Sequence, residues 1–177
     1  MSGCNEILKA AQQSARALVK QLELNQTDRL VMAESCTAGL ASGLLAQVPG
    51  VSQWLCGSAV TYRESVKTEW LGVSATTLAN YRAESMETTS EMALGVLRQT
   101  SEAKYSAAIT GHLGPGAPPA TDGQIFIAIA VRRDEETQID STHCFQLDSH
   151  ERVARQYESA DRVLGCLREA MAAGGND

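Results

Sequence analysis

Apolar residues recur every three or four positions through several segments of the chain, a spacing that places them on one face of a helix. The longest of these segments runs over residues 5–24, where the pattern extends from Ile7 to Leu22. A run of small and apolar residues begins at Leu40 and predicts a helix that ends near Pro49. The same reasoning predicts helices over residues 67–71, 75–81, 85–101 and 151–171.

Other segments are short and apolar, which is typical of strands. Strands are predicted over residues 29–33, 58–62, 105–110, 125–131 and 137–147. Residues 125–131 are all apolar, which suggests burial on both faces, and the charged turn after them predicts an antiparallel hairpin with the last strand. Helices that alternate with strands predict an α/β fold: a three-layer α/β/α sandwich with a mixed, mostly parallel sheet and a C-terminal antiparallel hairpin.

The composition is that of an ordinary globular protein, with 177 residues of which 44% are hydrophobic and 20% charged. Its length predicts one domain over residues 1–177. The net charge of −6 argues against a nucleic-acid partner, because binding to phosphate backbones needs clustered Lys and Arg. No apolar run approaches the roughly 20 residues of a membrane span, and the N-terminus lacks the pattern of a signal peptide. We therefore expect a cytoplasmic protein without a membrane partner.

The five cysteines are scattered along the chain, and none forms a C-x-x-C pair. His143 and Cys144 are neighbours, but they alternate within a predicted strand and so face opposite ways. We therefore expect neither a disulfide framework nor a metal site.

The segment Ser35 to Gly39 stands between the first predicted strand and a helix of small residues. At such a junction the backbone N–H groups of the helix start are unpaired, and the helix dipole is positive. A hydroxyl there can cap the helix, hold an anion, or attack a carbonyl whose oxyanion the same N–H groups stabilise. An ordinary N-cap is the simplest of these interpretations.

Two later segments also contain candidate chemistry. Residues 60–67 place Tyr62 at the end of a predicted strand and Lys67 five residues after it. Residues 111–123 form a loop that holds all but the first of the chain's four prolines together with several glycines. Loops of this length in compact domains are often functional, and the exposed N–H groups of its glycine-rich start could hold a phosphate or a ribose. A plain irregular loop is the alternative.

These three segments resemble the signature blocks of the CinA C-terminal domain family, also called the competence/damage-inducible protein family. The family's blocks read roughly Glu-Ser-Cys-Thr-Gly-Gly, Val-Thr-Tyr-Ser-Asn-Glu-Ala-Lys and Ser-Gly-Ile-Ala-Gly-Pro-Gly-Gly, and the likeness runs from about residue 30 to about residue 145. Characterised members are nicotinamide-nucleotide amidohydrolases. The resemblance therefore implies deamidation of nicotinamide mononucleotide to nicotinic acid mononucleotide and ammonia, in pyridine nucleotide salvage and without a cofactor.

The resemblance also implies a catalytic trio of Ser35, Tyr62 and Lys67. A serine hydroxyl needs a base, and no histidine is well placed by motif, so a Ser-His-Asp triad is not supported. A lysine can serve once burial or cationic neighbours lower its pKa, with Tyr62 relaying the proton or orienting the amine. A solvated surface role for Lys67 is the alternative. Cys36 is a rival nucleophile, for which a packing role is the other interpretation.

The expected substrate-binding residues lie on the turn and on the glycine-rich segment. They are Cys36, Thr37, Gly39, Thr110, Gly111, Gly114 and Gly116. We expect a small-molecule nucleotide as the substrate. Related domains also occur fused behind a domain resembling molybdopterin-binding proteins, and this sequence has no such segment, so we expect it to act alone or as a homo-oligomer.

The chain departs from the family pattern around these positions. Ala38 replaces the first glycine of the family's pair, His112-Leu113 replaces Ile-Ala, and Arg82-Ala83-Glu84-Ser85 stands where the family usually has Gly-Ala-Val-Ser. After the last strand the family's Gly-Asp-Arg is replaced by Leu147-Asp148-Ser149, so Arg152 or Arg155 would have to reach the substrate instead. These changes keep a second hypothesis open, in which the chain is a catalytically silent paralogue that binds a nucleotide or a protein.

Overall fold

A five-stranded sheet forms the centre of the protein, whose computed structural model describes residues 2–174. The strand order is β2-β1-β3-β4-β5, where β2 and β1 lie parallel, as do β1 and β3, and β4 is antiparallel to both of its neighbours. β4 therefore runs opposite to the other four strands, which confirms the mixed, mostly parallel sheet and the C-terminal hairpin. The strands are β1 (Leu30–Glu34), β2 (Leu55–Val60), β3 (Tyr105–Gly111), β4 (Gln124–Arg133) and β5 (Glu136–Gln146).

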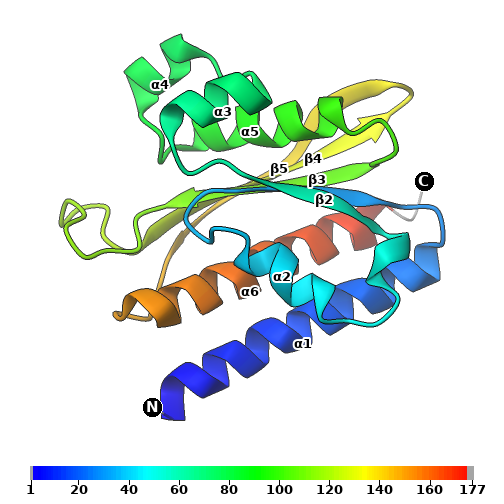
Figure 1. Ribbon diagram of the computed structural model, residues 1–177, viewed down its shortest axis with the longest axis horizontal. Helices are drawn as coiled ribbons and strands as arrows, with labels where there is room; N and C mark the ends of the chain where they lie inside the picture. Colours follow the sequence, from blue (N-terminus) through cyan, green and yellow to red (C-terminus); the bar gives the residue numbers. More distant parts are fainter. Residues whose placement is uncertain (1, 175–177) are drawn as a thin grey trace.

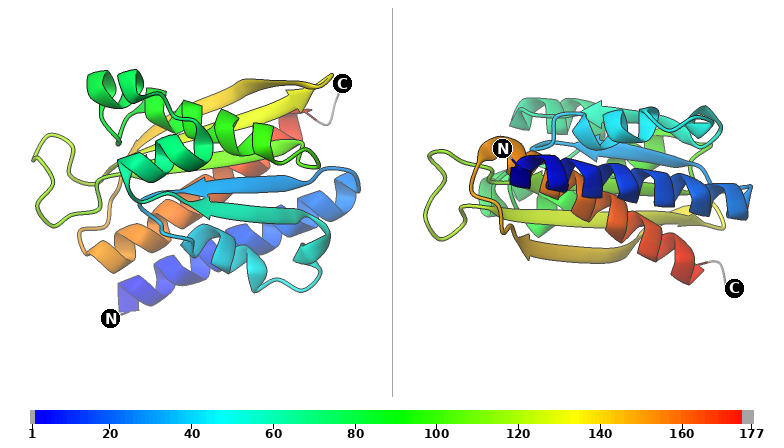
Figure 2. Two further views of the ribbon diagram at one scale, coloured as in Figure 1. Left: turned by 45° about the horizontal axis from the view of Figure 1, so that its top comes forward. Right: turned by 90° about the horizontal axis from the view of Figure 1, so that it is seen from below.

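Helices cover both faces of this sheet, which confirms the three-layer sandwich (Figure 1). One layer contains α1 (Ser2–Asn25), α2 (Leu40–Ala46) and α6 (Arg152–Ala173), and the other contains α3 (Glu64–Leu71), α4 (Ala75–Tyr81) and α5 (Met86–Gln99). A short 3-10 helix, Val51–Gln53, leads into β2. In Figure 2, α1 and α6 run side by side across their face of the sheet. Across residues 2–174, no helix has both the length and the apolar character needed to cross a membrane.

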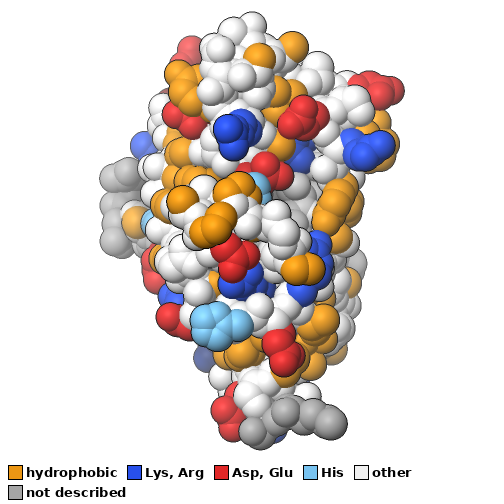
Figure 3. Space-filling view, turned by 90° about the vertical axis from the view of Figure 1, so that its left-hand side faces the viewer, with side chains coloured by type: hydrophobic (Ala, Val, Ile, Leu, Met, Phe, Trp, Pro, Cys, Tyr) orange, Lys and Arg blue, Asp and Glu red, His pale blue; other side chains and the backbone are white. Residues whose placement is uncertain are grey.

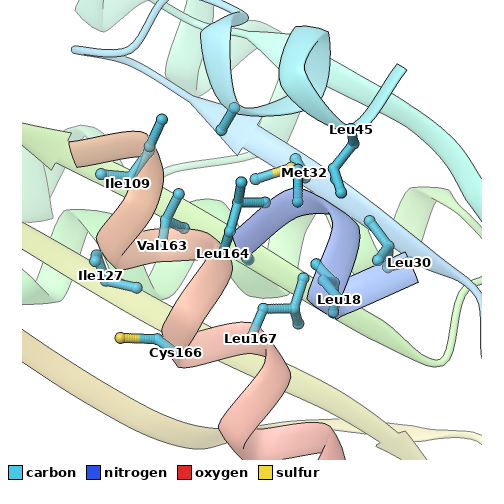
Figure 4. Packing of buried hydrophobic residues seen from close by; sticks show 14 of the residues in the cluster. Leu18, Leu30, Met32, Leu45, Ile109, Ile127, Val163, Leu164, Cys166 and Leu167 are labelled. Carbon is cyan, nitrogen blue, oxygen red and sulfur yellow. The ribbon is translucent and has the colours of Figure 1, made fainter. Parts of the chain in front are cut away.

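Alternation along β1 divides its side chains between two hydrophobic clusters. Leu30 and Met32 pack toward α1 and α6, whereas Val31 and Ala33 pack toward α5. Figure 4 shows the first of these clusters, which includes Leu164 of α6 and Met32 of β1. Because both faces of β1 are buried, its sequence lacks the alternation of apolar and polar residues that a half-exposed strand shows. The buried strand also fixes the position of the turn that follows it.

Three elements begin three residues earlier than the sequence predicts: α1, which begins at Ser2, and also β2 and α3. β2 runs from Leu55 to Val60 instead of over residues 58–62, and α3 begins at Glu64 instead of at residue 67. β2 is one of the two edge strands of the sheet and is only half-buried, so its residues lack a clear apolar pattern. The first turn of α3 is mostly exposed, so apolar spacing marks only its later part. The loop predicted over residues 111–123 has no helix or strand from residue 112 onward, whereas Gly111 belongs to β3.

A close helix contact fixes the position of α3. A Cβ atom added to Gly95 of α5 would lie 2.0 Å from the carbonyl oxygen of Leu71, at the end of α3. No side chain larger than hydrogen fits there without moving one of the two helices. Since α3 carries Lys67, this contact also sets where that lysine meets the sheet.

Candidate active site

The carboxyl ends of three parallel strands bring the three predicted segments together. Glu34 at the end of β1 pairs in register with Val60 of β2 on one side and with Ile109 of β3 on the other. The backbone N–H of Ser35 donates to the carbonyl oxygen of Ile109 at 3.0 Å. The turn after β1, the segment after β2 and the loop after β3 therefore meet at one edge of the sheet, where ligands of open α/β sheets commonly bind.

Ser35 and Lys67 form a hydrogen-bonded pair at this edge. The Nζ atom of Lys67 lies 3.0 Å from the Oγ atom of Ser35, and Nζ also donates to the carbonyl oxygen of Thr61. The Lys67 side chain is completely buried, which excludes a solvated surface role, and Ser35 is 7% exposed. Burial lowers the pKa of the Lys67 amine from its ordinary value. The negative charge of Glu84 opposes this shift and raises the pKa of Lys67, with smaller contributions from Cys36 and Glu64.

Tyr62 lies at the rim of the site, away from the buried pair. Its side chain is 56% exposed, and its hydroxyl is 2.9 Å from a guanidinium nitrogen of Arg152, which donates to it. Among the described residues, the Tyr62 hydroxyl makes no hydrogen bond to Ser35 or Lys67. In this arrangement Tyr62 borders the space in front of Ser35 and does not contact the amine.

A cavity of about 290 Å³ opens in front of Ser35. The turn, Tyr62 and the glycine-rich loop form its walls together with two charged residues, Glu84 and Arg152. Of the predicted binding residues, the cavity is lined by Cys36, Gly111, Gly114 and Gly116. Thr37, Gly39 and Thr110 do not line it, so the structure brings only part of the predicted set to this space.

Glu34 is the residue that sequence analysis missed. Its carboxylate is fully buried and accepts five hydrogen bonds, from the hydroxyls of Thr37 and Ser58 and from the N–H groups of Gly39, Ala41 and Ser42. The start of α2 is therefore already occupied by an anion from the chain itself. This corrects the expectation of free N–H groups at the helix start. A glutamate directly after a buried strand and before a helix was the available signal.

Two N–H groups of the turn remain as candidates for an oxyanion site. The N–H of Ala38 donates to the carbonyl oxygen of Ser35, and that of Gly39 donates to Glu34. Within residues 2–174, the N–H groups of Cys36 and Thr37 donate to no oxygen acceptor, and both act only on the Cys36 sulfur. The expected oxyanion site is thus narrowed from the whole turn to these two groups.

The thiol of Cys36 is a poor nucleophile in this position. Burial raises its pKa to about 12, although its own N–H and that of Thr37 lower it. A thiol with this pKa carries almost no thiolate near neutral pH, and only the thiolate is strongly nucleophilic. The local electrostatics therefore favour the packing interpretation of Cys36.

Of the remaining predicted residues, Thr37 and Thr110 make hydrogen bonds inside the protein. The Thr37 hydroxyl donates to Glu34 at 2.7 Å, and the hydroxyls of Thr110 and Thr89 lie 2.8 Å apart in the interior. Ala38 has a φ of +52°, a left-handed conformation that glycine would adopt more easily. As ligands of a substrate, Thr37, Gly39 and Thr110 stay predictions.

Arg152, at the start of α6, is the arginine that reaches the cavity. It donates to the carbonyl oxygen of Gly114 and to the Tyr62 hydroxyl. Arg155 points elsewhere, because its guanidinium forms two hydrogen bonds of 2.8 Å with the carboxylate of Asp122. That ion pair joins the glycine-rich loop to α6. Of the two arginines left open by the sequence, the geometry selects Arg152.

Comparison with protein families identifies the fold independently of this geometry. Residues 11–171 match the CinA C-terminal domain family. A CinA-like protein of Desulforapulum autotrophicum is 35% identical over 155 residues, which cover 86% of this chain and 35% of that protein. A CinA-like protein of Myxococcus xanthus is 41% identical over 103 residues, which cover 57% of this chain and 24% of that protein. The chain thus spans about a third or less of the length of these relatives.

Solved structures give the same picture over nearly the whole chain. The competence/damage inducible protein CihA from Agrobacterium tumefaciens is 27% identical, with a TM-score of 0.82, and covers 91% of this chain and 95% of its own. A competence or damage-inducible protein from Enterobacter asburiae is 26% identical, with a TM-score of 0.79, and covers 91% of this chain and 98% of its own. Competence damage-inducible protein A from Klebsiella pneumoniae, at 24% identity and a TM-score of 0.81, shares the fold.

Proposed function

The chain belongs to the CinA C-terminal domain family, and on that premise we propose that it is a serine amidohydrolase. Its substrate is nicotinamide mononucleotide, which it converts to nicotinic acid mononucleotide and ammonia. The buried hydrogen bond between Lys67 and Ser35 is the observation that carries this proposal. A completely buried lysine with a lowered pKa, bonded to a hydroxyl that borders a cavity, is the arrangement that an activated serine requires.

The first half of the reaction forms an acyl-enzyme. The neutral amine of Lys67 takes the proton from the Ser35 hydroxyl as its oxygen bonds to the amide carbon. The N–H groups of Cys36 and Thr37 stabilise the negative oxygen of the tetrahedral intermediate. The ammonium of Lys67 then returns its proton to the amide nitrogen, the carbon–nitrogen bond breaks, and ammonia leaves.

The second half restores the enzyme. Water attacks the acyl carbon and gives its proton to Lys67, and the bond between the carbon and the Ser35 oxygen breaks. Lys67 returns the proton to Ser35 as the acid product departs. The sum is amide plus water to acid plus ammonia, so neither an oxidant nor a reductant is needed. Tyr62, in contact with Arg152, borders the substrate and does not carry the proton in the free enzyme.

The glycine-rich loop and Arg152 would receive the phosphate of the nucleotide. The guanidinium of Arg152 lines the cavity and lies beside the loop backbone at Gly114. Arginine binds phosphate through charge-assisted hydrogen bonds, and such remote contacts orient the amide at Ser35. Arg152 thus takes the role of the arginine that the family carries in its Gly-Asp-Arg segment.

Ammonia release tests this proposal directly. Purified protein is incubated with nicotinamide mononucleotide, and both ammonia and nicotinic acid mononucleotide are measured, with the Ser35→Ala variant as the control. We expect equal amounts of the two products from the native protein and none from the variant. Absence of turnover in a folded protein that still binds the nucleotide would instead support the second hypothesis, a catalytically silent paralogue that binds a nucleotide or a protein. The replaced Gly-Asp-Arg segment motivates that hypothesis.

A further inference from the structure

Glu84 places a carboxylate in the wall of the same cavity as Ser35. It lies in the segment between α4 and α5, in a chain whose family usually has valine at this position. Glu84 also lines a neighbouring depression that contains Tyr62 and the first turn of α3. Its negative charge acts on the buried Lys67, whose pKa it raises. The carboxylate is therefore close enough to influence a charge held at the reacting centre.

No direct ion pair with lysine or arginine neutralises this carboxylate within residues 2–174, although Arg63 borders the same depression. Its side chain is 31% exposed, and within residues 2–174 its carboxylate lies 3.9 Å from the Nε2 atom of His112, beyond hydrogen-bond distance. No lysine or arginine of the described chain forms an ion pair with it. A partly buried carboxylate that lacks such a partner favours a cation bound from outside.

The opposite charge lies at a different border of the cavity. Arg152 also lines a second depression, together with Asp122 and Arg155, and Glu84 is not part of that lining. Glu84 lines a third depression, beside α3, and Arg152 is not part of that one. Figure 3 shows acidic and basic side chains interspersed on the face of the molecule that carries the glycine-rich loop. The cavity therefore fits a ligand whose own positive and negative charges are separated.

We propose that Glu84 determines specificity by favouring a positively charged ring. This inference rests on the proposed function, in which a pyridine carboxamide reacts at Ser35. When the ring nitrogen is alkylated, as in a pyridinium nucleotide, the ring carries a permanent positive charge that a carboxylate in the cavity wall attracts. A neutral pyridine carboxamide receives no such attraction. Glu84 thus separates N-alkylated pyridinium amides from neutral ones, and Arg152 attracts the anionic end of the same ligand.

Two small probes isolate the ring charge from the phosphate: 1-methylnicotinamide, which is cationic, and nicotinamide, which is neutral. The ratio of their kcat/KM values is measured for the native protein and for Glu84→Gln. We expect this ratio to fall roughly tenfold in the variant, as the loss of one charge contact at a partly exposed site predicts. Because both probes use the same base, any change in the pKa of Lys67 cancels in the ratio.

Glu64→Gln is the matched control, since Glu64 also raises the pKa of Lys67 but does not line the cavity. Its ratio should equal that of the native protein. An unchanged ratio in Glu84→Gln, or an equal fall in both variants, would overturn the role of Glu84.

Binding measurements separate this inference from the proposed function. If neither probe and no nucleotide releases ammonia, the proposed function fails, and the affinities of the two probes for the Ser35→Ala protein are compared instead. A preference for the cationic probe that disappears when Glu84→Gln is added supports the role of Glu84. A preference that persists, or that is absent from the start, overturns it.

Discussion

The candidate site has an inner half, the pair of Ser35 and Lys67, and an outer half at the rim of the cavity, and different interactions hold the two in place. Ser35 and Lys67 are buried and lie between a strand end and a helix, and each is fixed by backbone or side-chain hydrogen bonds. The outer half, which includes Tyr62 and Arg152, lines an open cavity and depends on a loop of twelve residues, 112–123, without helix or strand. Packing fixes the inner pair, whereas a few polar contacts position the rim.

This contrast separates the chemistry from the choice of substrate. The inner half keeps the family's Ser and Lys residues, and its turn departs from the family at Ala38. The other departures lie in or near the rim, at Glu84, at His112-Leu113 and after the last strand. A buried pair tolerates little change, because any new side chain must fit a close-packed interior. A new charged side chain at the exposed rim costs little free energy of folding. Substitutions in the two halves should therefore produce different kinetic effects.

The largest effect is expected from Ser35→Ala, which removes the nucleophile. Turnover should fall by roughly 1,000-fold or more, because no other activated nucleophile stands at the cavity. The free energy of unfolding should change by only about 1 kcal/mol, the net scale of one hydrogen bond, here the one that Lys67 donates to the Ser35 hydroxyl. Initial rates of ammonia release and urea unfolding measure the two quantities. Cys36→Ala should cost far less activity, and the reverse order would move the chemistry to the thiol.

Removal of the base comes next. Lys67→Met and Lys67→Arg should both be nearly inactive, since neither side chain takes up a proton near neutral pH. In the native protein burial lowers the pKa of Lys67 from 10.5, and the amine is active only when neutral. The rate should therefore rise with pH until this lowered pKa is passed, and activity should be poor in mild acid.

The measurement for this second prediction is a pH–rate profile of the native protein and of both variants. Lys67→Met serves as a control for packing, because its uncharged chain of similar size suits a buried position. Substantial turnover in Lys67→Arg with an unchanged profile would make the lysine an electrostatic anchor and would require another base.

Glu34→Gln tests the support of the inner half. A glutamine side chain offers one acceptor oxygen and one amide nitrogen where five donors now meet a carboxylate. At least one buried N–H would lose its acceptor, so the free energy of unfolding should fall by about 2 kcal/mol. Because the turn carries Ser35, kcat should fall roughly tenfold or more, with little change in KM. A fall in stability alone would show that Glu34 does not position the nucleophile.

Arg152→Ala tests the rim and should have the opposite kinetic signature. We expect KM for nicotinamide mononucleotide to rise roughly tenfold or more, because a charge-assisted contact with phosphate is lost. The rate with nicotinamide, which has no phosphate, should stay the same. Arg168→Ala removes the same charge from an exposed position of α6 and should leave both substrates unaffected. Equal native rates with the nucleotide, its riboside and free nicotinamide would remove the loop from substrate binding.

The smallest effect concerns the backbone of the turn. Ala38 has a positive φ, which costs an L-residue about 1–2 kcal/mol, whereas glycine adopts it freely but loses more chain entropy on folding. Ala38→Gly should therefore raise the free energy of unfolding by about 0.5 kcal/mol, as measured by urea unfolding. Ala79→Gly, in the exposed part of α4, should lower it by about 1 kcal/mol, and the same sign in both variants would contradict this account.

Apolar spacing was enough to predict the layers of the fold, because burial on one or both faces leaves a periodic trace in the sequence. The start of β2 left no such trace, since an edge strand at Cys56-Gly57 is only half-buried. The sequence indicated Ser35 and Lys67 through motifs, but the role of Glu34 depends on donors from two further elements that meet only in three dimensions. The choice of Arg152 over Arg155 likewise depends on Asp122, which is more than thirty residues away along the chain.

The carboxylate of Glu34 also affects product release. A helix start ordinarily presents about half a positive charge, which retains anions. At α2 a full negative charge already outweighs it, one residue before the nucleophile. In the proposed reaction the neutral amide becomes a carboxylate beside this turn, and the start of α2 has no free N–H groups with which to retain it. The group that holds the turn therefore also keeps the helix start from binding the product, and inhibition by accumulated acid should be weak.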